Sequence, residues 1–530
     1  MGRTVIIEES VENYISSLYG IHKWQIGLII GQLSPQRDYV LHLARTPEQT
    51  GDSDGDCKPA AIDDIENNWI VEHAHQVSRM LTGGLDVIGV FAFGPMDMLT
   101  KSQVKLRQLV FSIQKIVQHK AASYFDNLIH SRILLQICSG TKKITCRTID
   151  VSDQRISAVS FIMLQATPNP AEVKYQSFSS KWSKLEASLS LTDGCFDVPR
   201  KLETSGLNKQ IMSSIHKTLQ SISSALCTVN GELYADDQTL VSSEKSGRSS
   251  QASSTQTFKI DLFTDESCNN MEPVEVDTAA SIRISGSMCC QAYVHQKATA
   301  GEAVQALKYD AIRCFLSRCE VLCEYVMENQ EEKPNRGTCN LGCCTFEVKN
   351  SVIYEHGKKK KSDYRQGIQP RILRFRAPPQ RYKGLRDVTM RCVLFIEWLN
   401  SPFFPSFSLS ETFFSTWTSP QRVFVPLGSG PVKVCDYVFK DETLKESKER
   451  IAELLGIELK EEDFECIEDF PDVQTVRSLV EEMQTESNEE ITESEEVQQG
   501  PGKRVIGAVV GIVVAVVAAG VTFLLGEQTG

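Results

Sequence analysis

The 530-residue chain lacks the sequence features that mark secreted proteins and the commonest enzymes. Residues 1–10 contain no apolar stretch behind a basic segment, so we expect no signal peptide. No Asn-x-Ser/Thr acceptor for N-glycosylation occurs in the sequence. The Walker, G-x-S-x-G, G-x-G-x-x-G and H-E-x-x-H patterns are also missing. These absences favour a cytosolic body and argue against nucleotide-binding, serine-hydrolase and zincin chemistry.

Charge is unevenly distributed along the chain. The formal net charge is -12, but residues 441–500 alone carry 21 acidic and 5 basic residues, while residues 336–422 carry 15 basic and 6 acidic residues. The rest is close to neutral, so we predict no nucleic-acid partner. Residues 481–496 contain eight glutamates and no basic residue, which is typical of a solvated disordered spacer.

The longest uncharged run lies near the C-terminus. Residues 505–525 begin with Val505, end with Leu525 and include Gly507, Gly511 and Gly520. At about 1.5 Å per residue, a helix of this length covers the hydrocarbon core of about 30 Å. We therefore predict a single transmembrane helix, with the lipid bilayer as a partner.

The flanks of this run predict its topology. Only five residues follow it, so we expect insertion after synthesis, as a tail anchor. Lys503 and Arg504 precede it, which places the N-terminal body in the cytosol by the positive-inside tendency. Gly507-x-x-x-Gly511 is a small-xxx-small pattern that permits close helix packing, although such patterns arise easily in an anchor rich in small residues.

The 17 cysteines are expected to be reduced in the cytosol. One group lies in a run of helical apolar periodicity and is predicted to be buried core; a second group lacks the paired C-x-x-C spacing of zinc modules. These groups are Cys314, Cys319 and Cys323, and Cys339, Cys343 and Cys344. We predict no metal and no cofactor.

Apolar periodicity in the first 151 residues alternates between strands and helices, which indicates an α/β layer. We expect Asp63 or Asp64 to cap one helix and Gly83-Gly84 to end it. The predicted strands are residues 4–8, 24–33 and 85–93, the other helices are 11–19 and 104–117, and residues 133–138 and 144–151 form a hairpin.

His73, His75 and Asp86 have the H-x-H-x10-D spacing of the zinc-dependent MPN isopeptidases. In a helix, however, residues two apart point about 200° apart and cannot bind one ion. We interpret both histidines as helix residues, with His73 facing the apolar stripe of Trp69 and Val77.

The MPN pattern fits two other segments better. Residues 27–31 resemble the G-L-L-x-G strand of MPN domains, and residues 89–95 resemble the end of their G-W-Y-H-x-H-P strand. In this register the zinc ligands are replaced by Ala92, Gly94 and Lys105, and the general base by Trp24. The resemblance implies an MPN-like fold without catalysis. A membrane-anchored zinc isopeptidase of the MPN type remains the alternative.

Several blocks resemble the odorant-response-abnormal protein four family: residues 1–4, 27–32, 72–74, 76–81, 83–85, 139–146, 423–426 and 435–437. The resemblance implies a non-enzymatic, tail-anchored protein of the endoplasmic reticulum membrane that helps certain G-protein-coupled receptors mature and traffic. It further implies partnership with the cysteine protease specific for the ubiquitin-fold modifier. A tail-anchored SNARE would need about eight heptads before the span, and residues 444–457 supply only two.

These observations predict an MPN-like α/β pseudoenzyme body, a smaller α+β region, an acidic disordered stalk and one transmembrane helix. We interpret residues 335–420, with the tetralysine at 358–361, as an isoform or gene-model insertion. The predicted segments are an MPN-like domain at 1–235, a Ser-rich linker at 236–257, an α+β domain at 258–334 plus 421–470, the insertion at 335–420, an acidic spacer at 471–504 and the span at 505–525.

Overall fold

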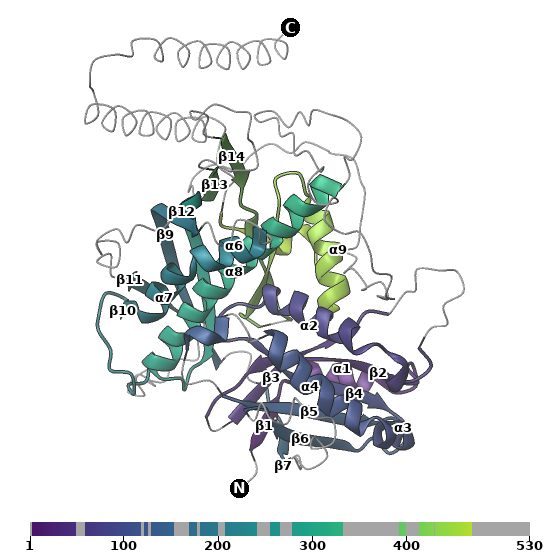
Figure 1. Cartoon of the computed structure of the whole chain (residues 1–530). Coiled ribbons are helices and arrows are strands. Elements are labelled where there is room, and N and C mark those ends of the chain that lie inside the picture. The colour runs from purple at the N-terminus through teal and green to yellow at the C-terminus, as the bar shows by residue number, and fades with distance from the viewer. Residues whose placement is uncertain are drawn as a thin grey trace, which may run out of the picture. The chain divides into compact units, whose positions relative to one another are not determined.

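Figure 1 shows the computed structural model of the chain. The structure describes residues 3–35, 37–48, 59–117, 121–125, 129–152, 169–177, 181–199, 207–240, 255–264, 278–331, 392–398, 413–428 and 430–468. The predicted spacer, the topology residues Lys503 and Arg504, the span at 505–525 and the second cysteine group lie outside these residues. Within the described ranges, every helix is either too short or too polar to cross a bilayer.

The first half of the chain forms an eight-stranded mixed sheet in the order β7-β6-β5-β4-β2-β3-β1-β8. β4 and β5 are parallel, β2 is antiparallel to both of its neighbours, and β5 and β6 form the predicted antiparallel hairpin. The strands are β1 (Thr4–Ile7), β2 (Gln25–Gln32), β3 (Arg37–Arg45), β4 (Asp86–Gly94), β5 (Ser131–Cys138), β6 (Ile144–Asp150), β7 (Asn169–Pro170) and β8 (Glu172–Tyr175).

Helices cover both faces of this sheet, so the predicted α/β layer is confirmed. Helix α1 (Glu9–Leu18) buries Val11, Ile15 and Leu18 against one face. Helices α2 (Asn67–Met80) and α4 (Gln103–Val117), with the short α3 (Met96–Lys101) before α4, pack on the other (Figure 1). Strands β2 and β4 are consequently buried on both faces, which explains their nearly continuous apolar sequences.

The predicted start of the helix that contains His73 is wrong. Residues Ile62–Asp64 form a 3-10 turn, η1, and α2 begins only at Asn67. The Asp64 carboxylate accepts hydrogen bonds from the backbone nitrogens of Ala60 and Ala61, at 3.1 and 2.9 Å. It therefore caps the turn rather than the helix, and extended backbone at Ile65 separates the two.

A six-stranded sheet, in the order β10-β11-β9-β12-β13-β14, carries the middle of the chain. The change from the first sheet to this one, between Tyr175 and Trp182, falls inside the range 1–235 that the sequence assigns to one domain; the domain boundaries stay a prediction. The elements are β9 (Trp182–Pro199), α6 (Leu207–Ser214), α7 (His216–Ser224), β10 (Leu226–Val229), β11 (Gln256–Phe263), β12 (Thr278–His295), α8 (Ala300–Glu331), β13 (Cys392–Trp398) and β14 (Phe413–Thr418).

The cysteines of α8 and the strands within residues 335–420 bear on two predictions from the sequence. Cys314, Cys319 and Cys323 are buried on α8, as the core interpretation requires. Strands β13 and β14 lie within residues 335–420, and β13 pairs antiparallel with β12. The insertion hypothesis concerns the transcript and stays a prediction.

The last described segment returns to the first sheet. A three-stranded sheet in the order β16-β15-β17 joins α9 (Leu444–Leu455); its strands are β15 (Gln421–Pro426), β16 (Lys433–Val438) and β17 (Glu465–Cys466). A capping box of Thr443 and Glu446 starts α9. At its other end, His73 Nε2 lies 2.8 Å from the Leu454 carbonyl oxygen and His42 Nε2 lies 2.6 Å from that of Leu455. These contacts satisfy carbonyls that a helix end leaves without partners.

The turn between α2 and β4, residues 82–85, joins all three sheets, and we call it the Gly-Gly junction. The Gly83 N–H donates to the Gln291 carbonyl at 2.9 Å, and the Tyr293 N–H donates to the Gly83 carbonyl at 2.8 Å, so the junction pairs with β12. The Thr82 hydroxyl donates to the Lys433 carbonyl on β16. A Cβ at Gly83 would lie 2.4 Å from the Ala306 carbonyl oxygen, and therefore only glycine permits this approach.

Buried ion pairs hold α8 to the last segment. Arg422 binds both carboxylate oxygens of Asp310, at 2.8 and 2.9 Å, and both side chains are almost fully buried. Arg318 binds Glu468, whose carboxylate also accepts from the Arg422 backbone N–H. Paired and hydrogen-bonded in this way, the charges are compensated for their loss of water.

Gly84→Ala tests the junction, with Gly20→Ala as the matched control. Gly84 (φ +79°) and Gly20 (φ +84°) share the left-handed conformation. A Cβ at Gly84 would lie 2.1 Å from the Tyr293 oxygen, whereas no atom of the described residues lies within 4 Å of a Cβ at Gly20. We expect the control to lower the free energy of unfolding by about 1 kcal/mol. Gly84→Ala should lower it by about 3 kcal/mol or more, because backbone must move. Urea unfolding of the full chain measures both; equal losses would contradict this account.

His73→Gln tests the contact with α9. Burial lowers the pKa of His73 from 6.5 to about 4. Its stabilising contribution is therefore complete above pH 6.5 and is lost as the pH falls toward 4, by about 3 kcal/mol at about 1.4 kcal/mol per pKa unit. The Gln amide keeps the donor without titrating. Wild type should lose more stability than the variant in urea unfolding between pH 6.5 and 4, and parallel losses would refute the assignment.

Candidate functional site

The structure brings together three of the four residues at the vacated MPN positions, Trp24, Ala92 and Gly94. Trp24 directly precedes β2, which pairs with β4 so that Gln25 lies opposite Phe93 and Ile26 opposite Ala92. A Cβ at Gly94 would lie 3.4 Å from the Trp24 Cβ. Ala92 is buried two residues before Gly94, on the same face of the strand. The bulk of Trp24 is thus set against the strand end where the MPN pattern has its histidines.

Lys105, the third replacement, binds backbone. Its ammonium group donates to the carbonyl oxygens of Asp63, at 2.8 Å, and Ile65. Burial lowers the pKa of Lys105, while the nearby Asp63 and Asp64 act in the opposite direction. This side chain on α4 therefore ties the η1 turn to the helix layer.

The two histidines of the H-x-H pattern point to different neighbours, and their interpretation as helix residues is confirmed. His73 is buried and contacts α9, whereas His75 lies 3.5 Å from Glu320 on α8 and 3.8 Å from Glu72. The neighbouring carboxylates, Glu320 first and then Glu72, raise the pKa of His75 to about 9. Asp86 accepts from the Val87 N–H. Among the described residues, no group of three or more His, Cys, Asp or Glu side chains is arranged to hold a metal ion.

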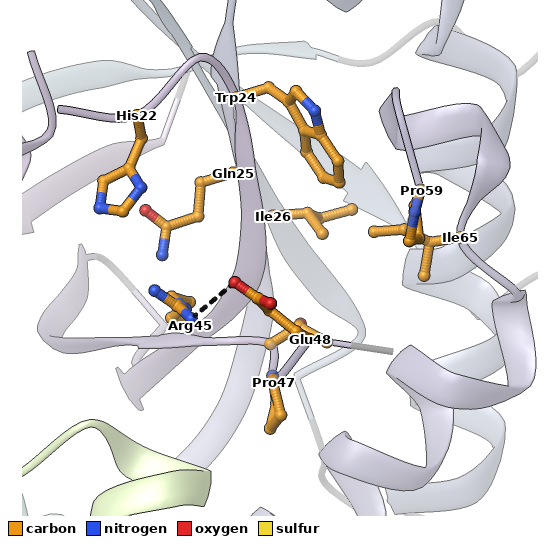
Figure 2. Close-up of a pocket in the computed structure, with 10 residues that line it drawn as sticks. His22, Trp24, Gln25, Ile26, Arg45, Pro47, Glu48, Pro59 and Ile65 are labelled. Atoms are coloured by element: carbon orange, nitrogen blue, oxygen red, sulfur yellow. Dashed lines mark ion pairs between the residues drawn. The ribbon is translucent and has the colours of Figure 1, made fainter. Parts of the chain in front are cut away.

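A pocket of about 220 Å³ opens beside Trp24 (Figure 2). Its residues come from the start of β2, the end of β3 and the η1 turn. The apolar side chains of Trp24, Ile26, Pro59 and Ile65 gather on one side of the view in Figure 2, and His22, Gln25 and Arg45 on the other. The full lining is His22, Trp24, Gln25, Ile26, Arg45, Thr46, Pro47, Glu48, Pro59 and Ile65.

Two polar side chains in the pocket wall have hydrogen-bonding capacity left over. Gln25, 5% exposed, donates from Nε2 to the Tyr14 hydroxyl at 3.1 Å, but its Oε1 has no hydrogen-bond partner within the described chain. The same holds for the hydroxyl of Thr46, which is 7% exposed. Arg45 and Glu48 form an exposed ion pair, 3.7 Å apart. The pocket thus has an apolar side and a side with charged groups, while the unpartnered oxygens of Gln25 and Thr46 are themselves buried.

The sequence pointed to this place only through Trp24. Gln25 and Thr46 become neighbours because the Thr46 N–H donates to the Ile26 carbonyl, a contact between β2 and the end of β3. Strand β3 was missed in the sequence, since its alternation is interrupted by charged and polar residues at both ends. No local pattern marks Gln25 or Thr46 as pocket residues.

The sheets and helices together define a mixed α/β body, with the pocket at one end of β2. The odorant response abnormal 4-like family model matches residues 27–466. The chain is 31% identical to the protein odr-4 homolog of Gallus gallus over 98% of both chains. It is 29% identical to the Mus musculus and 28% identical to the Homo sapiens protein odr-4 homolog, over 99% of each chain. The chain belongs to the odorant response abnormal 4-like family, as its sequence blocks predict.

Lys105→Met tests how the pocket wall is held. We expect it to lower the free energy of unfolding by about 1 kcal/mol, because two backbone carbonyls lose a charged donor. Amide hydrogen exchange should also rise in residues 62–66, where Ile65 lines the pocket. Lys101→Met on α3, an exposed lysine, is the control and should leave exchange there unchanged. If both variants exchange alike, Lys105 does not hold the turn.

Proposed function

We propose that this chain is a non-enzymatic trafficking and maturation factor for a subset of G-protein-coupled receptors. The observation that carries the proposal is the family match over residues 27–466, with similarity over the whole length of the odr-4 homologs. The family's name refers to an abnormal response to odorants, and odorant detection depends on receptors that must reach a membrane. We therefore assign receptors as the proteins that this chain helps to reach the membrane.

In the same proposal, the body is an MPN-like pseudoenzyme that acts as a scaffold. Support comes from the strand-end position of Ala92 and Gly94, with Trp24 packed beside them, and from Lys105 bound to backbone carbonyls. These residues offer neither imidazole nor carboxylate to a zinc ion, which needs typically three protein ligands and a water. The scaffold would hold the cysteine protease specific for the ubiquitin-fold modifier. Stoichiometric zinc in the purified full chain would instead favour the alternative, an MPN-type isopeptidase.

The proposal assigns affinity and location to different parts of the chain. The α/β body binds the protease. Residues 505–525 anchor the chain as a single-pass tail in the endoplasmic reticulum membrane. The apolar length of that run and the basic Lys503 and Arg504 before it support this division. The acidic residues 471–504 would keep the body clear of the bilayer. Confinement to one membrane raises the rate of encounter between scaffold, protease and receptor.

Deletion of residues 505–525 tests the division. We expect the truncated protein and its protease partner to move into the soluble fraction of cells, with their association in pull-down unchanged. A control in which the run is replaced by 21 leucine and alanine residues should restore the membrane fraction. Loss of protease binding on deletion would show that the anchor contributes to the interface and would overturn the assignment.

A further inference from the structure

We propose that Arg37, Lys181 and Lys297 form a binding site for a phosphate monoester, carried either by a free small molecule or by a lipid headgroup. The inference stands on this cluster of cations and does not rest on the proposed function. The three side chains come from three segments that meet around His295, and they form no ion pair among the described residues.

The pairing of β9 with β12 brings the two lysines together. Trp182 at the start of β9 lies opposite His295 at the end of β12. One residue further out, the Gln296 N–H donates to the Lys181 carbonyl oxygen at 2.9 Å. Lys297 follows directly, so both lysines extend from the same end of this strand pair.

Arg37 reaches the same place from the first sheet. The Tyr39 ring on β3 stacks on the His295 ring, with centroids 4.5 Å apart and planes 14° apart. Arg37 precedes Tyr39 by two residues in a strand that pairs with β1 without a bulge, so both side chains leave the same face. The contact between the two sheets therefore brings a guanidinium group toward the two lysines.

The charges that act on His295 are all positive. Burial, followed by the charges of Lys297, Lys181 and Arg37, lowers the pKa of His295 from 6.5 to about 4. The imidazole is therefore neutral near neutral pH and adds no charge of its own. The fold thus gathers three cations without placing an anion among them, which costs electrostatic free energy that a bound anion would recover.

Other charged groups in the neighbourhood already have partners. The nearby ion pairs are Arg3 with Asp38 and Lys184 with Glu186. Glu302, the carboxylate that acts on Tyr39, accepts a hydrogen bond from the Thr299 N–H at 3.0 Å, where α8 begins. Among the described residues, only the cations of the cluster are left in this region without a carboxylate partner.

A phosphate monoester suits three such cations better than a carboxylate does. It carries a charge of about −1.5 to −2 near neutral pH and three strong acceptor oxygens, whereas a carboxylate carries a single charge. The fork of Arg37 can bind two phosphate oxygens, and the lysine ammonium groups can reach the others as point charges. Arg37 and Lys297 are exposed and Lys181 is half-buried, so a small molecule or a headgroup has access to all three.

Ligand-observed NMR on the full chain in a neutral detergent tests the inference. The probes are methyl phosphate and acetate, which present the same methyl group on different anions. At low ionic strength we expect methyl phosphate to bind with a Kd of about 1 mM, and acetate at least tenfold more weakly because of its lower charge. Added salt should weaken the binding of methyl phosphate, because the site is open to solvent. Equal binding of the two anions would overturn the inference.

Variants assign the binding to the cluster. Arg37→Gln, Lys181→Gln and Lys297→Gln should each weaken the binding of methyl phosphate about fivefold, and the triple variant should abolish it. Lys101→Gln, which replaces an exposed lysine on α3 outside the cluster, is the control and should leave the affinity unchanged. Circular dichroism verifies that each variant is folded. Binding that survives in the folded triple variant would contradict the assignment.

Nanodiscs decide the source of the phosphate. If a lipid headgroup occupies the cluster, phosphatidic acid in the nanodisc should compete with methyl phosphate and weaken its binding at least tenfold relative to phosphatidylcholine alone. Nanodiscs with phosphatidylserine at equal negative charge control for general repulsion of anions. A loss specific to phosphatidic acid would assign the lipid, whereas equal affinity in both anionic nanodiscs would assign a free small molecule.

Discussion

The close approach of the Gly-Gly junction to strand β12 is the contact on which the rest of the fold depends. A Cβ at Gly84 would strike the Tyr293 carbonyl oxygen on β12, and a Cβ at Gly83 would strike the Ala306 carbonyl oxygen on α8. Arg313 on α8 then donates to the carbonyls of Thr82 and Leu85, at 2.6 and 3.1 Å. One short turn thus serves the first sheet, the six-stranded sheet and, through Thr82, the three-stranded sheet. Geometry requires this pair of glycines, and the prediction that they end α2 is wrong, because α2 ends at Met80 with Leu81 as its C-cap.

The buried charges extend this interface and make the body a single unit. Asp310 accepts from the Gln291 backbone N–H as well as from Arg422, so β12, α8 and β15 meet at one carboxylate. A carboxylate with these donors is stable in the interior, whereas loss of its arginine would leave an uncompensated charge. Segments more than a hundred residues apart therefore complete one another. The family match, from residue 27 to 466, includes all of these segments.

Apolar periodicity in the sequence predicted the elements that bury one face of a helix or both faces of a strand. Val11, Ile15 and Leu18 gave the period of α1, and the apolar runs of β2 and β4 followed from burial on both faces. The prediction from the sequence was wrong where one side chain could cap either of two neighbouring elements. Asp64 suits a helix cap but caps the η1 turn, because the nitrogens of Ala60 and Ala61 are its nearest donors. The pocket was anticipated only at Trp24, since Gln25 and Thr46 meet through pairing of β2 with the end of β3.

The sequence by itself determined the α/β character of the first half, the burial of Cys314, Cys319 and Cys323, and the family, because periodicity and short blocks are local properties of the chain. Only the tertiary structure decided why Gly83 and Gly84 stand together and which carbonyls Lys105 holds. It also decided that His73 contacts α9 whereas His75 contacts α8, and that Gln25 Oε1 and the Thr46 hydroxyl have no hydrogen-bond partner among the described residues. Each of these depends on which distant segment arrives as a neighbour, and sequence periodicity carries no information about that choice.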